Sequence, residues 1–249
     1  VYFEHPAGYK KAANFGTYWG ASDMFSYSLG VAAGLMTKTN KIAFLGGFQI
    51  PQIIDSINAF HLGARSVNPN VTTYAIFNGT WSDPAKEATA TNALADQGVD
   101  VVTGIVDSPI SFVETAEKRG IMSIGYHSAS VSKFAPNGWI SGIDFQFGAY
   151  FAKCAQAAIA GNWAAENYIG DVNSGIVRMA QYGKNVPDSV KVKTLNTIQS
   201  FENGTVKSPF VGPVYDQKGT LRIKAGEYPD WNFVNTVDWF AQGIVGQTS

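Results

Sequence analysis

The sequence predicts an α/β fold with a parallel, doubly wound sheet, and three observations support this prediction. Between residues 41 and 130, short apolar runs alternate with longer stretches whose apolar residues recur at helical spacing. The apolar runs are continuous rather than alternating, which is typical of strands buried on both faces. Proline and glycine stand at the junctions in the positions expected for helix starts and ends. This order of strands and helices implies right-handed crossovers.

Four apolar runs predict the strands of this region, at residues 42–45, 73–77, 101–106 and 122–124. The helix after the first strand is predicted by apolar residues that recur every three or four positions over 50–64. It should end before Pro69, because proline cannot continue a helix.

The two later helices carry explicit start signals. Asp83 followed by Pro84 is typical of an N-cap and the first helical position, and Gly98 is a candidate C-cap for the same helix. Ser108 followed by Pro109 repeats the start signal. The region therefore has the pattern βαβαβαβ.

The flanking regions predict further elements. Ahead of the first apolar run we expect strands over 1–5 and 15–18 and a helix over 25–36. After the last we expect a helix over 187–202, a β-hairpin over 211–223 and a final helix over 231–245. The final helix should turn Phe233, Val237 and Phe240 inward.

Composition excludes several classes of protein. Apolar residues make up 45% and charged residues 15%, which is typical of a folded domain and not of a disordered chain. A net charge of -1 with no basic cluster argues against nucleic acid as a partner. Phosphate-binding glycine motifs and metal-ligand spacings are absent from the sequence, so we expect no cofactor and no metal. The single Cys154 is interpreted as a small core residue.

Polar and aromatic residues follow each of the four predicted strands. Carboxyl ends of neighbouring parallel strands meet at one crevice, so these tips predict one ligand-binding wall. The candidate residues are Phe48 after the first strand, Trp81 after the second, Asp107 and Ser108 after the third, and Gly125 and His127 after the fourth.

Several short motifs, spread over nearly the whole chain, resemble one protein family. They are Phe3-Glu4-His5 to Gly8-Tyr9-Lys10, Leu29 to Gly34, Ile57 to Phe60 with Gly63-Ala64-Arg65, Gly79 to Lys86, Gly125 to Ser128, Phe210 to Pro213, Asp216 to Gly219, and Asp238-Trp239-Phe240. In this order and spacing they are similar to the basic membrane protein (BMP) group of ABC-transporter substrate-binding proteins, which includes bacterial purine-nucleoside receptors.

The resemblance implies a type I periplasmic-binding-protein fold with two Rossmann-like lobes and a hinge. Residues 41–144 would form one lobe, while residues 1–40 and 145–249 would supply the hinge and the remainder of the amino-terminal lobe. That lobe would be incomplete, because family members begin with a further segment that carries its first strands. The C-terminal elements are expected to complete it rather than to contact ligand.

The resemblance also implies a purine-like small molecule as ligand and an ABC permease in the membrane as partner. The protein is expected to act as a monomer in the periplasm or at the cell surface, from a lipid-anchored or secreted precursor. Trp81 stands where nucleoside-binding relatives place an aromatic ring on the base, and base stacking contributes about 1 to 3 kcal/mol. The open alternative is that Trp81 only packs the following helix start.

Two positions depart from the family pattern. His127 stands where relatives carry an aspartate that binds the ribose hydroxyls, and Asp144 stands where they carry a lysine. We expect a hydrogen bond between His127 and Asp144, with the aspartate favouring the charged imidazole. This exchange would favour a nucleobase or another flat heterocycle over a plain ribonucleoside. A purely structural role for His127 stays open.

The remaining candidates have open alternatives. Asp107 and Ser108 would offer an acceptor and backbone donors to a ligand, or Ser108 would only cap a helix. Phe48 would form a pocket wall or core packing, and Phe145 would be an aromatic contact at the crossing between the lobes.

Two other functions stay open. One is the ligand-sensing domain of a receptor, which would share this fold. The other is a hydrolase in which His127 and Asp144 would activate Ser128, although the sequence has no nucleophile elbow.

Overall fold

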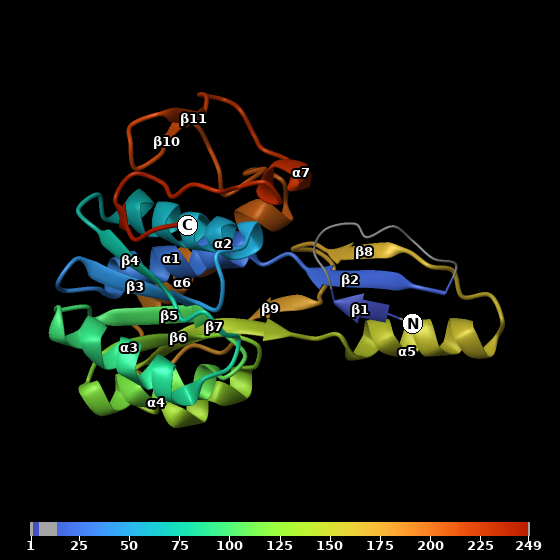
Figure 1. The fold of residues 1–249 in the computed structure, drawn as a ribbon, viewed down its shortest axis with the longest axis horizontal. Helices are drawn as coiled ribbons and strands as arrows, with labels where there is room; N and C mark the ends of the chain where they lie inside the picture. Colours follow the sequence, from blue (N-terminus) through green and yellow to red (C-terminus); the bar gives the residue numbers. More distant parts are fainter. Residues whose placement is uncertain (1, 5–13, 249) are drawn as a thin grey trace.

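The computed structural model describes residues 2–4 and 14–248 (Figure 1). The strand expected at the start of the chain is present as β1 (Tyr2–Glu4). His5 and the rest of the first family motif lie outside the described residues. None of the helices in the described part is long and apolar enough to cross a membrane.

A mostly parallel seven-stranded sheet forms the larger part of the molecule, in the order β12-β4-β3-β5-β6-β7-β9. Pairing is parallel from β12 to β7, and β9 joins β7 antiparallel at the edge. The strands are β3 (Lys41–Gly46), β4 (Thr72–Phe77), β5 (Val101–Ile105), β6 (Met122–Gly125), β7 (Trp139–Phe145), β9 (Val177–Met179) and β12 (Ile244–Val245). The four predicted strands are thus confirmed, next to one another in this sheet.

Helices cover both faces of this sheet (Figure 1). One face carries α1 (Asp23–Met36), α2 (Pro51–Val67) and α6 (Asp188–Glu202), and the other carries α3 (Pro84–Asp96), α4 (Pro109–Arg119) and the 3-10 helix η1 (Ala129–Phe134). Alternate residues of β3 enter the two cores: Ile42 and Phe44 face α1 and α2, while Ala43 and Leu45 face α3 and α4. Both faces are therefore dry, as the continuous apolar strands predict.

Glycines bring α1 and α2 into close contact. A Cβ at Gly30 of α1 would lie 2.0 Å from the carbonyl oxygen of Phe60, and one at Gly63 of α2 would lie 2.0 Å from that of Tyr27. The two backbones consequently touch where the glycines face them. This contact holds α1 against α2 in the larger part, although α1 directly follows a crossing from the smaller part.

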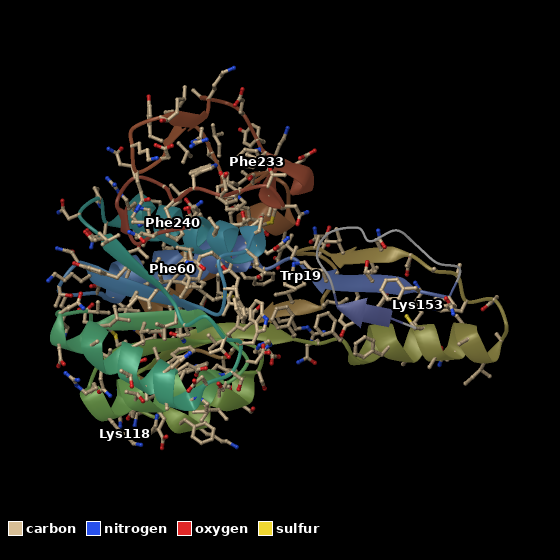
Figure 2. All side chains as sticks on the ribbon, viewed as in Figure 1. Trp19, Phe60, Lys118, Lys153, Phe233 and Phe240 are labelled. Carbon is tan, nitrogen blue, oxygen red and sulfur yellow. The ribbon has the colours of Figure 1, made fainter. Side chains whose placement is uncertain are left out.

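The smaller part is a three-stranded parallel sheet, β1-β2-β8, with α5 (Gly148–Ile159) packed beside it. Its strands β2 (Gly16–Gly20) and β8 (Asn167–Gly170) pair in register, and Trp19 of β2 lies near the junction with the larger part (Figure 2). Cys154 of α5 is half-buried at the edge of the core. The chain crosses between the two parts at residues 20–23, 145–148 and 170–177.

Aromatic side chains line the crossing after β7. Phe145 and Phe147 stack at 5.5 Å between ring centroids, and Tyr18 of β2 meets Phe147 and Phe151 edge to face at 5.0 Å. Because β7 runs directly into α5, the carboxyl edge of the large sheet faces the smaller part (Figure 1). The predicted ligand wall therefore lies at this junction.

Strand order corrects the expected assignment of the flanking elements. Residues 1–40 and 145–249 were expected in the other lobe, but β9 and β12 belong to the large sheet and α1 packs on α2 and α6. The hairpin of β10 (Val214–Tyr215) and β11 (Leu221–Ile223) is joined to the C-terminal segment of the larger part by a β-bridge between Asp216 and Ala241. Among the described elements, β1, β2, α5 and β8 form the smaller part. The reason is that α1 and α6 bury their apolar faces in the core over β3.

The final helix expected over 231–245 is wrong beyond its first turn. The structure has a short α7 (Trp231–Val234), then an irregular segment and β12. Phe240 is buried as expected, although it is not in a helix. The Asn58 side chain of α2 holds the backbone on either side of it: Asn58 accepts from the Ala241 amide at 2.8 Å and donates to the Trp239 carbonyl at 2.9 Å. These buried bonds take backbone groups that a helix would use internally.

Candidate functional site

The loop after β4 presents Trp81. Gly79 has a positive φ of 68°, and Asp83 caps α3 by accepting the Lys86 amide, so the chain turns sharply before the helix. The indole of Trp81 is 38% exposed and meets the ring of Phe48 edge to face at 5.1 Å. It lies over Gly47, where a Cβ would come within 2.6 Å of the ring. Glycine at position 47 therefore leaves the room that the indole occupies.

The loop after β6 presents His127 in a strained conformation. His127 has a φ of 70°, in the left-handed region that is uncommon for residues other than glycine, although asparagine, aspartate and histidine adopt it more often than the rest. Its Nε2 lies 3.4 Å from Oδ1 of Asp107, and its ring contacts Tyr126 and Phe145. The strand tips of β5 and β6 therefore meet through this pair.

The expected hydrogen bond between His127 and Asp144 is wrong. Asp144 instead accepts the Ala129 amide at 2.8 Å and the Gln146 amide group at 2.6 Å. Asp144 is half-buried, and these bonds occupy both of its oxygens at the start of η1. Asp144 thus supports the loop that carries His127, because η1 begins two residues after His127.

The expectation that Asp144 favours the charged form of His127 is also wrong. Desolvation of the imidazole lowers the pKa of His127, and the nearby Asp107 carboxylate offsets this effect only in part. The side chain is still 43% exposed. At neutral pH it is therefore a neutral imidazole that offers one donor and one acceptor.

Asp107 and Ser108 occupy the loop between β5 and α4. The Asp107 carboxylate is 59% exposed, and its backbone amide donates to the Trp81 carbonyl at 2.6 Å. Ser108 stands at the N-cap position, but its side chain makes no capping bond and instead donates to Glu87 Oε1 at 2.5 Å. Sequence reasoning missed Glu87. The available signal was its position four residues after the N-cap Asp83, from which a carboxylate can reach back to the Asp83 amide.

The last two candidates differ in their surroundings. Phe145 is half-buried between Tyr126 and Phe147 at the crossing, beside the His127 ring. Gly125 is buried, and a Cβ there would come within 2.2 Å of the Trp139 ring, so this glycine admits Trp139 beneath the site.

The tips of β5 and β6 open onto a pocket of about 810 Å³. Asp107, Ser108, His127 and Ser128 line it together with Ile110 of α4 and Val131 of η1. Trp81 and Phe48 stand outside this lining. Within the described residues, no three His, Cys, Asp or Glu side chains gather to hold a metal ion.

The geometry gives little support to a serine nucleophile. The Ser128 hydroxyl shares a hydrogen bond with the Ser130 hydroxyl at 2.9 Å and accepts the Ser130 amide at 3.2 Å. No hydrogen bond between Ser128 and His127 is found in the part of the chain that the structure describes.

Comparison with known proteins identifies the family. The model of the Bmp family, described as PnrA-like ABC transporter substrate-binding proteins, matches residues 1–218. The chain belongs to this family. It is 35% identical over 244 residues to a purine-binding protein of Brucella abortus, with 98% of this chain and 69% of that protein covered. The resemblance stated from the motifs is thereby confirmed.

A second relative is a putative ABC transporter glucose-binding protein of Haloferax volcanii. The two are 32% identical over 201 residues, which cover 81% of this chain and 51% of the relative. The chain thus spans about half the length of that protein.

Solved structures confirm the fold. An ABC transporter solute-binding protein from Aeropyrum pernix superposes with a TM-score of 0.68 at 14% identity, covering 80% of this chain and 67% of that one. Another from Conexibacter woesei gives 0.58 at 18% identity, covering 78% and 65%. The chain has the fold of periplasmic binding proteins.

Proposed function

We propose that this protein is the solute-binding component of an ABC importer and captures a small aromatic heterocycle, a purine base or a nucleoside. The observation that carries the proposal is the exposed indole of Trp81, braced by Phe48 and set beside the Asp107 and His127 pair at one sheet edge. The relatives support the ligand class: besides the Brucella abortus purine-binding protein, an ABC transporter nucleoside-binding protein of Lactococcus lactis is 39% identical over 82 residues, which cover 33% of this chain and 23% of that protein.

Each part of the proposed wall would contribute a different interaction. The face of Trp81 would stack on the heterocycle, which is worth about 1 to 3 kcal/mol for a base. The exposed Asp107 carboxylate would accept ring or exocyclic N–H groups, and the neutral His127 would both donate and accept. A flat ligand with donors along one edge fits this arrangement.

The strained backbone of His127 supports a functional role. A non-glycine residue in the left-handed region costs about 1 to 3 kcal/mol and persists where the surrounding structure requires it. His127 adopts this positive φ, and its ring lies beside Asp107 in the lining of the pocket. Asparagine or glycine would adopt this backbone at lower cost, so stability alone does not account for histidine here.

Closure of the two parts would complete binding. The crossings at residues 20–23, 145–148 and 170–177 would act as the hinge, and rotation about them would desolvate the ligand between both walls. An ABC permease would recognise the closed form, outside the cytoplasm, in the periplasm or at the cell surface.

The test begins with the protein as purified. It is denatured, and any released small molecule is identified by mass and ultraviolet spectrum. The emptied protein is then titrated by calorimetry with adenine, guanine, hypoxanthine, adenosine, guanosine and, because of the Haloferax volcanii relative, glucose. A purine or nucleoside that binds in 1:1 ratio would support the proposal. Binding of glucose alone would contradict the ligand class.

Two variants locate the site. Trp81→Ala should weaken binding roughly tenfold to a hundredfold, the range expected for loss of base stacking. His127→Asn keeps a residue that tolerates a positive φ and should weaken binding severalfold without lowering the melting temperature. If both variants bind the ligand like the unaltered protein, the ligand does not sit on this wall.

A further inference from the structure

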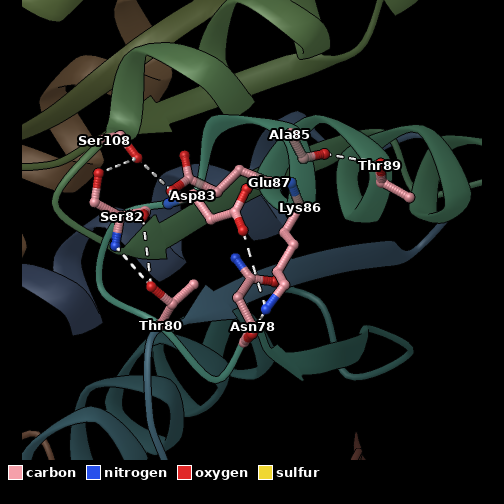
Figure 3. A network of polar contacts seen from close by, with 9 residues as sticks. All are labelled: Asn78, Thr80, Ser82, Asp83, Ala85, Lys86, Glu87, Thr89 and Ser108. Carbon is pink, nitrogen blue, oxygen red and sulfur yellow. Dashed lines mark hydrogen bonds and ion pairs between the residues drawn. The ribbon is translucent and has the colours of Figure 1, made fainter.

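Glu87 joins the two loops of the proposed ligand wall. It lies in the first turns of α3, is 1% exposed, and its Oε1 accepts from the Ser108 hydroxyl at 2.5 Å (Figure 3). The same oxygen faces the Asp83 amide at 3.4 Å, and the Ser82 hydroxyl donates to that of Ser108 at 3.3 Å. One buried carboxyl thus connects the loop that carries Trp81 with the loop that carries Asp107.

Two further bonds run between the same loops. The Asp107 amide donates to the Trp81 carbonyl at 2.6 Å, and the Ser111 hydroxyl donates to the Pro84 carbonyl at 2.6 Å. These bonds need the start of α4 to lie against the start of α3. Glu87 is the buried side chain of the set.

The position is costly for a carboxyl group. Among the described residues, Glu87 Oε2 is buried without a hydrogen-bond partner. Burial raises the pKa of Glu87, as do the negative charges of Asp83 and Asp107, while the bonds from Ser108 and Asp83 act in the opposite direction. The nearby Lys86 amine is directed elsewhere, 4.0 Å from an Asp83 oxygen and 3.4 Å from the Asn78 carbonyl.

An apolar residue of similar length would avoid this cost. Replacement of a buried polar group by an apolar one of the same shape is often neutral or stabilising when no partner is left stranded. The partner here, Ser108, lies half-buried beside a pocket open to water. Stability therefore does not explain the carboxyl, whereas the link to the ligand loops does.

We infer that Glu87 is a positioning residue of the ligand site, which fixes Ser108 against α3 and thereby sets the spacing between the Trp81 indole and the Asp107 carboxylate. This inference rests on the proposed function, because that function makes the spacing matter. The link itself is a property of the ligand-free protein and can be measured without any ligand.

The experiment compares Glu87→Met, which removes the acceptor at nearly constant volume, with Glu87→Gln, which keeps an oxygen for Ser108. Thr91→Val is the matched control: Thr91 is buried one turn further along α3, and its hydroxyl donates to the Glu87 backbone carbonyl at 2.8 Å, away from Ser108. Each protein is measured for thermal unfolding, for hydrogen exchange of the Asp107 amide by NMR without ligand, and for affinity toward the purine panel.

We expect exchange of the Asp107 amide to rise about tenfold in Glu87→Met, as for loss of one hydrogen bond to a carboxyl group. Its melting temperature should be equal to or above that of the unaltered protein, and its affinity should fall severalfold. Glu87→Gln should stay within about twofold in both measurements, since its oxygen still accepts from Ser108. Thr91→Val should leave the melting temperature nearly unchanged, because the Glu87 carbonyl still accepts the helical amide, and it should leave exchange at Asp107 and affinity unchanged.

The inference is overturned if Glu87→Met exchanges at Asp107 like the unaltered protein, or if Glu87→Gln behaves like Glu87→Met. If Glu87→Met fails to fold, Ser108→Ala removes the same bond from the other loop, and its ligand-free exchange decides the question. Failure of every purine probe to bind the unaltered protein would contradict the proposed function, while the exchange measurements would still test the link.

Discussion

His61 should make the stability of this protein fall steeply in mildly acidic solution. The ring lies on α2, fully buried, with Nδ1 2.8 Å from the Thr73 hydroxyl and Nε2 3.0 Å from the Gln242 carbonyl. A carbonyl can only accept, so Nε2 carries the hydrogen and Thr73 donates to Nδ1. Arg65 donates to the same Gln242 carbonyl at 3.2 Å. The site thus holds a neutral imidazole.

The size of the effect follows from the pKa. Burial lowers the pKa of His61 from 6.5 to about 4; the bond to Gln242 opposes this effect, and the charge of Arg65 adds to it. A tenfold change in proton affinity corresponds to about 1.36 kcal/mol, so protonation of His61 opposes folding by about 3 kcal/mol in total. Because the unfolded chain binds the proton first, this stability is present above pH 6.5 and is lost as the pH falls toward 4.

The assay is urea denaturation of the protein and of His61→Gln at intervals between pH 4 and pH 7.5. Glutamine keeps a donor for Gln242 and does not titrate, so the variant should be less stable at neutral pH but should lose less stability on acidification. The slopes should differ by up to about 1.36 kcal/mol per pH unit below pH 6.5.

Comparison with the variant also removes the effect of other buried groups. Burial raises the pKa values of Asp23, Asp55 and Glu87, so these carboxyls favour folding at low pH and lose that contribution as the pH rises. They act equally in both proteins. Parallel curves for the protein and His61→Gln would refute the argument.

Two further predictions concern packing. Asn58→Ala should lower the free energy of unfolding by about 2 to 4 kcal/mol, because it leaves a backbone amide and a backbone carbonyl of the C-terminal segment buried and unpaired; urea midpoints check this, and a loss below about 0.5 kcal/mol would contradict it. Gly30→Ala should destabilise by about 2 kcal/mol or more despite the better helix propensity of alanine, because its Cβ would overlap a carbonyl of α2. Gly148→Ala is its matched control, since a Cβ there meets nothing within 4 Å. Equal melting temperatures for the two glycine variants would disprove the close contact of α1 and α2.

Local pattern was enough for the elements that are encoded locally. The starts of α3 and α4 were predicted because proline with a preceding Asp83 or Ser108 sets the backbone of the first turn by itself. Four strands of the large sheet were predicted because continuous apolar runs are typical of strands that helices cover on both faces. The placement of Trp81, Asp107 and His127 at one edge followed from the same rule, since all three come directly after parallel strands.

Local pattern failed where distant residues compete for the same backbone. Residues 231–245 have helical spacing, yet the buried amide of Asn58 binds their backbone and most of the segment is irregular. The assignment of α1 and α6 to the other lobe failed for a similar reason. Their apolar faces show that they are buried but not against which sheet.

The sequence by itself determined the family, the strand and helix order of the large sheet, and the set of residues at its carboxyl edge. Only the tertiary structure decided that His127 faces Asp107 and not Asp144, that its imidazole is neutral, and that Glu87 joins the two loops. The physical reason is that caps, turns and hydrophobic periodicity act over a few residues. A side chain's partner and its pKa depend instead on the distances and desolvation that arise when segments twenty or more residues apart are packed together.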